Sequence, residues 1–268
     1  MTQTQTPAPE SEQMEPDHNP KPLVEHLVEL RNRLMWCFLA VIAGTGFCYF
    51  FVQDIYGFLV RPLADAMGDG DTQRLIYTNL TEAFFTYIKI SFFGGLFLMF
   101  PVLAVQIWGF IAPGLYGRER RAFLPYLVAT PVLFITGAAL VYYFIMPLAW
   151  RFFLGFQSTG AETALPIQLE ARVSEYLDLV MVLMFAFGLC FQLPVLLSLM
   201  ARAGLITAET LASRRKYAIV VIFVAAAVLT PPDIISQVGL AIPLIGLYEM
   251  SIVLVRRICK ERAARHGA

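Results

Sequence analysis

The side chains best placed to do chemistry in this chain are carboxylates that precede its first long apolar run. Glu25 and Glu29 lie four residues apart, and Arg33 follows Glu29 at the same spacing. An acid followed four residues later by a base is the favourable order for a helical ion pair. The group is either a solvated helix face with one weak pair, which composition alone favours, or a carboxylate held at a membrane surface to receive a cation.

A further acid, Glu119, stands within a cluster of arginines: Arg118, Arg120 and Arg121. The segment before it carries aromatic and turn-forming residues: Trp108, Phe110, Pro113, Gly114 and Tyr116. The acid could stabilise a helix start by about 0.3–1 kcal/mol, with the aromatic rings forming an interfacial belt. A carboxylate beside ordered aromatic rings can also bind a guanidinium by ion pairing and stacking. The spacing leaves these two interpretations even.

The histidines and cysteines are scattered, at His18, His26, His266, Cys37, Cys48, Cys190 and Cys259. They form no CxxC pair and no zinc-type cluster, and no recognisable catalytic motif accompanies them. We therefore expect no metal, no cofactor and no enzymatic activity.

The composition requires a bilayer around the elements that position the acids. Of the 268 residues, 58% are apolar and only 15% are charged, against about 45–50% and about 25% in soluble domains. The formal net charge of +0 argues against a nucleic-acid partner, because phosphate binding needs a basic field. We predict an all-α integral membrane domain over 23–257, a disordered cytoplasmic tail over 1–22 and a cytoplasmic tail over 258–268.

Six apolar segments could cross about 30 Å of hydrocarbon. They are residues 34–52, 83–108, 122–147, 176–200, 217–229 and 234–255. The fifth segment covers only about 20 Å as a helix, and Pro231 and Pro232, which follow it, cannot continue a helix. We therefore expect short fifth and sixth helices joined by a tight hairpin.

Basic residues are concentrated on one side of the predicted membrane. The richer side has the end segments and the second and fourth connections, with Lys21, Arg31, Arg33, Arg118, Arg120, Arg121, Arg202, Arg214, Arg215, Lys216, Arg256, Arg257, Lys260, Arg262 and Arg265. The other side has only Arg61, Arg74, Arg151 and Arg172. By the positive-inside rule, both termini are cytoplasmic, which an even number of spans also requires.

A few polar side chains lie inside the predicted spans. Lys89 and Asp178 are close enough to the span ends to reach water, so we interpret both as structural. Gln192 lies about 24 Å along its span and needs a hydrogen-bond partner from another helix or from water in a groove. Gln237 and Glu249 pose the same problem in the last span, although Glu249 is closer to the interface.

Four segments together resemble the TatC family, the polytopic subunit of the twin-arginine protein translocase. They occur in the family's order and spacing, at 26–34 (HLVELRNRL), 110–121 (FIAPGLYGRERR), 185–195 (FAFGLCFQLPV) and 229–237 (LTPPDIISQ). The resemblance implies a receptor for twin-arginine signal peptides in a bacterial-type cytoplasmic (inner) membrane. With TatB and TatA, such a receptor would export folded cargo using the proton-motive force, in contact with lipids and in several copies per complex.

The resemblance also implies roles for single residues. Glu29 and Glu119 match the two acids associated with twin-arginine recognition. Other matching positions of that site are Arg31, Phe110, Pro113 and Tyr116. Thr230 and Gln237 match positions near the outer ends of spans five and six, where TatA and TatB dock in the family. Asp233 and Glu249 match two further family positions.

One position departs from the family, because some members have a glutamate in the fourth span where this chain has Gln192. Glutamine keeps the hydrogen bonding but cannot carry a proton, which puts a titrating carboxylate at that site in doubt. The alternative function is a proton-coupled secondary transporter or channel, which would need paired intramembrane charges and a midplane cavity. The deep polar residues here are mostly amides, which disfavours that alternative.

Overall fold

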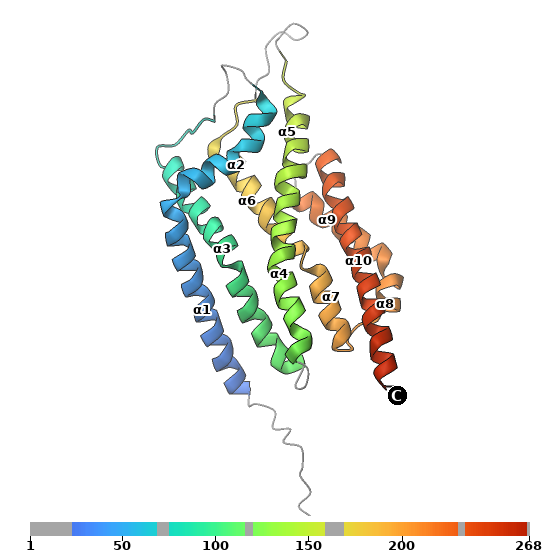
Figure 1. Ribbon diagram of the computed structural model, residues 1–268. Helices are drawn as coiled ribbons and strands as arrows, with labels where there is room; N and C mark the ends of the chain where they lie inside the picture. The colour runs from blue at the N-terminus through green and yellow to red at the C-terminus, as the bar shows by residue number, and fades with distance from the viewer. Residues whose placement is uncertain (1–22, 69–74, 116–119, 159–168, 230–233, 267–268) are drawn as a thin grey trace, which may run out of the picture.

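Long helices run side by side through most of the molecule (Figure 1). The computed structural model describes residues 23–68, 75–115, 120–158, 169–229 and 234–266. Within these ranges the secondary structure is helical, and no strand is longer than an isolated bridge such as that between Ile76 and Arg172. The all-α fold predicted from the sequence is confirmed.

Six helical rods make up the bundle in the described ranges. Four rods are single helices: α1 (Leu23–Phe50), α3 (Glu82–Leu115), α9 (Arg215–Leu229) and α10 (Ile234–His266). The third rod joins α4 (Arg120–Leu140), a π-helical turn (Val141–Ile145) and α5 (Met146–Leu154), and the fourth joins α6 (Val173–Cys190) to α7 (Leu193–Arg202). All rods except α9 are long and apolar enough to cross a membrane.

The last two rods differ in length. The helix α9 is short, as expected, with 15 residues. The helix α10 has 33 residues, so it is longer than the short sixth helix expected from the sequence and runs on into the segment 258–268 assigned to a tail. It continues beyond Val255 because the charged segment that follows is rich in good helix formers and has no glycine before Gly267.

Two shorter helices lie in connections to which the sequence analysis assigned no element: α2 (Val52–Met67) and α8 (Ala208–Ser213). The helix α2 crosses one end of the bundle (Figure 1) and packs on α5. It buries Leu59 and Leu63 while its polar residues keep its overall hydropathy below that of a span. A search for apolar runs therefore misses it.

Glycine brings α1 and α3 into close contact. A Cβ atom added at Gly95 of α3 would lie 2.7 Å from the carbonyl carbon of Gly44, and one added at Gly44 of α1 would lie 2.9 Å from the carbonyl oxygen of Gly95. Small residues allow such close approach between helices in membranes. This contact sets how α1 and α3 lie relative to each other.

The fourth rod is two helices rather than the continuous span expected from the sequence, because the chain turns just before Pro194. At the turn, the backbone N–H of Gln192 donates to Leu189 at 2.9 Å and not to Gly188. The Gln192 side-chain Nε2 instead donates to the carbonyl oxygens of Gly188, at 3.3 Å, and of Thr130 in α4, at 3.0 Å. Gln192 therefore faces another helix, and its amide replaces a helical hydrogen bond that the turn removes.

Candidate functional site

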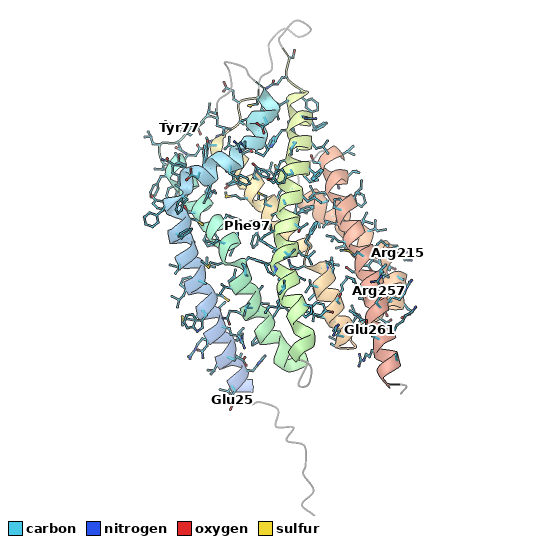
Figure 2. The ribbon with its side chains drawn as sticks, in the orientation of Figure 1. Glu25, Tyr77, Phe97, Arg215, Arg257 and Glu261 are labelled. Atoms are coloured by element: carbon cyan, nitrogen blue, oxygen red, sulfur yellow. The ribbon has the colours of Figure 1, made fainter. Side chains whose placement is uncertain are left out.

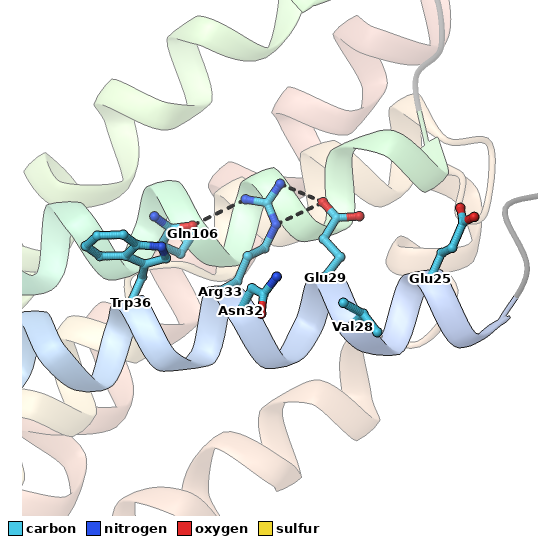
Figure 3. A pocket seen from close by; sticks show the side chains of 7 residues that line it. All are labelled: Glu25, Val28, Glu29, Asn32, Arg33, Trp36 and Gln106. Atoms are coloured by element: carbon cyan, nitrogen blue, oxygen red, sulfur yellow. Dashed lines mark hydrogen bonds and ion pairs between the residues drawn. The ribbon is translucent and has the colours of Figure 1, made fainter.

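An open pocket of about 500 Å³ lies beside the first turns of α1 (Figure 3). It lies at the end of the bundle where α10 also ends, as the positions of Glu25 and Glu261 show in Figure 2. The pocket is lined by charged, amide and apolar side chains of α1 and by one residue of α3: Glu25, Val28, Glu29, Asn32, Arg33, Trp36 and Gln106.

An ion pair between Glu29 and Arg33 forms part of the wall of this pocket. Arg33 donates from Nε and from Nη2 to the same oxygen, Oε1 of Glu29, at 3.0 and 2.7 Å. The two side chains are only 25% and 28% exposed, respectively, so water screens their attraction in part. The helical pair predicted from the spacing is present, and it shows that this carboxylate can hold a guanidinium.

The second side of the Arg33 guanidinium lies against α3. Its Nη1 donates to Oε1 of Gln106 at 3.4 Å, across 73 positions of sequence (Figure 3). A Cβ atom at Gly109, about one turn further along α3, would collide with Nη1 and lie 3.2 Å from Cζ. The bare backbone at Gly109 therefore gives the guanidinium room between the two helices.

Aromatic rings stand next to the carboxylate. The ring of His26 on α1 stacks on Phe110 of α3, with centroids 4.3 Å apart and planes inclined by 15°. The structure thus stacks Phe110 on a side chain that lies one turn before Glu29 on α1. The predicted site residue Arg31 is exposed, donates to Asn32 at 3.3 Å and does not line the pocket.

Several predicted site residues lie outside the described residues: Tyr116, Glu119, Thr230 and Asp233. The turn expected at Pro113 is corrected, because α3 continues through it to Leu115. The pocket also contains residues that the sequence analysis did not assign to a site, namely Val28, Asn32, Arg33, Trp36 and Gln106. Only the spacing of Arg33 carried a signal in the sequence, since Gln106 reaches the pocket through the packing of α3 on α1.

The polar residues of the spans pair with other helices. Lys89 of α3 and Asp178 of α6, each about half exposed, form an ion pair of 2.7 Å. Glu249 of α10 pairs with Arg215 at the start of α9, with Oε1 and Nε 2.5 Å apart. These contacts join neighbouring helices. Among the described residues, no cluster of three or more histidine, cysteine or acidic side chains could hold a metal ion.

Gln237 joins the last two helices near the middle of α9. Its Nε2 on α10 donates to the carbonyl oxygen of Phe223 on α9 at 3.2 Å. The side chain is partly buried. Gln237 therefore helps to hold the two helices together.

Comparison with known proteins places this arrangement in a family. A family profile described as "Sec-independent protein translocase protein (TatC)" matches residues 25–243. The protein of that name from Magnetococcus marinus is 54% identical over 247 residues, which cover 92% of this chain and 88% of the relative. The Escherichia coli K12 protein of the same name is 39% identical and covers 88% of each chain.

A solved structure agrees with the sequence relatives. The "Crystal Structure of Twin Arginine Translocase Receptor- TatC" is similar to this fold with a TM-score of 0.75 and 39% sequence identity. The match covers 87% of this chain and 99% of the other. The family match includes Glu29, Arg33 and Gln106, together with nearly all of α1 and the first ten residues of α10. The chain therefore belongs to the TatC family and is a membrane-embedded subunit of the Sec-independent protein translocase.

Proposed function

We propose that the chain is the signal-peptide receptor of its translocase and binds the twin-arginine motif through carboxylates at the cytoplasmic surface. The observation that carries the proposal is the Glu29–Arg33 pair, in which a partly buried carboxylate already holds a guanidinium through two donors. Arginine stays charged in proteins, so its acceptors must lie where it need not enter hydrocarbon. A carboxylate at the end of a membrane-spanning helix meets that requirement and offers strong charge-assisted bonds.

Glu119 is the second acceptor in this proposal. It directly precedes α4 and follows the end of α3 at Leu115. Phe110, near that end of α3, stacks on His26 one turn before Glu29. The connection that contains Glu119 therefore starts from an end of α3 that packs beside the first turns of α1. The other residues proposed to contact the signal peptide are Arg31, Phe110, Pro113 and Tyr116.

A binding measurement tests the assignment of the two acids. Full-length protein in nanodiscs is titrated with fluorescent signal peptides that carry Arg-Arg or Lys-Lys. A charge-assisted hydrogen bond contributes about 1.5–3 kcal/mol, so Glu29→Gln and Glu119→Gln are each expected to weaken Arg-Arg binding about tenfold or more. The matched control is Glu261→Gln, which removes an exposed acid from α10. Unchanged affinity in both variants, or no preference for Arg-Arg over Lys-Lys, contradicts the proposal.

The proposed topology places both termini in the cytoplasm of a bacterial-type cell, with the chain crossing the inner membrane. The start of α1 and the end of α10 lie at the same end of the bundle, which supports this topology (Figure 1). The last turns of α10 carry basic side chains, as the positive-inside rule requires: Arg256, Arg257, Lys260 and Arg262. In this orientation the Glu29 pocket faces the compartment in which signal peptides are made.

We also assign the α9–α10 side of the bundle to the single-span partners TatB and TatA, which with several copies of this chain would export folded cargo using the proton-motive force. The helix α9 exposes an apolar strip suited to a partner helix or to lipid: Val220, Val221, Val224 and Val228. Gln237, beside this helix, and Thr230 would supply hydrogen bonds, with Asp233 in the intervening connection. Co-purification of Gln237→Leu with TatB at the native level, with normal export, would exclude Gln237 from the docking site.

A further inference from the structure

We propose that Arg33 is an internal competitor for Glu29, and that a signal-peptide arginine must displace it to bind. This inference rests on the proposed function of Glu29 as an acceptor. In the structure, two of the donors of Arg33 already occupy Oε1 of Glu29, at 3.0 and 2.7 Å. An incoming guanidinium would require the same oxygen, so the resting ion pair and the bound signal peptide exclude each other at that atom.

The surroundings of Arg33 give it a second position. Its Nη1 is already 3.4 Å from Oε1 of Gln106 on α3, a distance that a small movement would shorten (Figure 3). Gly109 has no side chain to block a movement toward α3. When Glu29 is taken by a ligand, the guanidinium of Arg33 can therefore move to Gln106 and remain hydrogen-bonded at the pocket wall.

An internal competitor has a defined thermodynamic effect. It lowers the apparent affinity by the fraction of molecules in which the acceptor is accessible, and this fraction is independent of the ligand. Arg33 therefore weakens the binding of Arg-Arg and Lys-Lys peptides by the same factor. For a helical pair of this exposure, that factor is about three- to sixfold. Arg33 lowers the affinity for both peptides and leaves the ratio of their two dissociation constants unchanged.

Peptide titration of the full-length protein in nanodiscs tests the competitor. Arg33→Gln is expected to increase the affinity for both the Arg-Arg and the Lys-Lys peptide about three- to sixfold. Arg33→Lys keeps the charge but loses the fork of donors, so it should tighten both peptides by a smaller factor. The matched control is Arg257→Gln, which removes an exposed arginine from α10 and should leave both affinities unchanged.

A general charge effect is separated from competition by two further results. If removal of positive charge alone tightened binding, Arg33→Lys would match the unmodified protein. If Arg33 acts through Glu29, the gain from Arg33→Gln disappears in a Glu29→Gln background. Circular dichroism and gel filtration establish that each variant is folded, and Arg33→Lys remains the test if Arg33→Gln is not recovered.

The outcomes distinguish the competitor from the receptor function. Unchanged or weaker binding by folded Arg33→Gln, or by Arg33→Lys where only that variant folds, overturns the competitor. If Glu29→Gln still weakens binding in that case, the receptor function stands and Arg33 only positions Glu29. If the unmodified protein has no preference for Arg-Arg and Glu29→Gln has no effect, the receptor function itself is lost.

Discussion

Replacement of Gly95 by alanine should lower the stability of the molecule. The same change should disturb the contact between Arg33 and Gln106 in the pocket. The added Cβ would lie 2.7 Å from the carbonyl carbon of Gly44 and 2.8 Å from Cα of Thr45, whereas carbon atoms pack best about 3.5–4.0 Å apart. The atoms in the way belong to the backbone of α1, so the whole helix must move by about 1 Å. Overpacking of this kind costs about 1–3 kcal/mol.

Thermal unfolding in detergent, followed by tryptophan fluorescence, measures this loss. With about 2–4 °C per kcal/mol for a chain of similar size, the midpoint should fall by roughly 2–12 °C. The displaced α1 should also lose the 3.4 Å contact between Arg33 and Gln106 and change peptide affinity. The control is Gly46→Ala on α1, where an added Cβ meets no atom within 4 Å and alanine favours the helix by about 1 kcal/mol. If both variants unfold at the same temperature, the close contact is not what holds α1 to α3.

Two other contacts give predictions of smaller effects. Gln192→Leu should lower stability by about 1–2 kcal/mol, because the carbonyl oxygens of Gly188 and Thr130 lose a donor; an unfolding midpoint equal to that of the unmodified protein would show that the amide is not required. Replacing Lys89 by methionine and Asp178 by leucine, singly and together, should give a coupling free energy of no more than about 1 kcal/mol in a double-mutant cycle, because both side chains are half exposed. A coupling several times larger would mean that the pair is desolvated in the bilayer.

The sequence predicts the long helices because their apolar runs are dictated by the membrane and need no tertiary information. It fails where a helix depends on its neighbours. The helix α2 has too many polar residues to read as a span and forms because Leu59 and Leu63 are buried in the core. The division of the fourth rod was signalled by Pro194, yet whether proline kinks or ends a helix depends on the partners available to the freed carbonyl groups.

The candidate site was predictable only along one helix. The spacing of Glu29 and Arg33 is local, so the helical period alone brings them together. The position of Gln106 beside Arg33 follows from the register of α3 on α1, which Gly44 and Gly95 fix through a backbone contact. A stacked His26–Phe110 pair depends on the same register. No pattern within one segment contains that information.

The turn between α6 and α7 divides one rod between two sets of neighbours. The upper piece, α6, packs on α3 and α4, whereas the lower piece, α7, packs chiefly on α10. The Gln192 amide supplies the bond to Gly188 that the turn removes and also donates to Thr130, so it ties the turn to α4. One membrane-crossing rod thus links the part of the bundle that contains α3, α4 and the guanidinium pocket to the part that ends in α10.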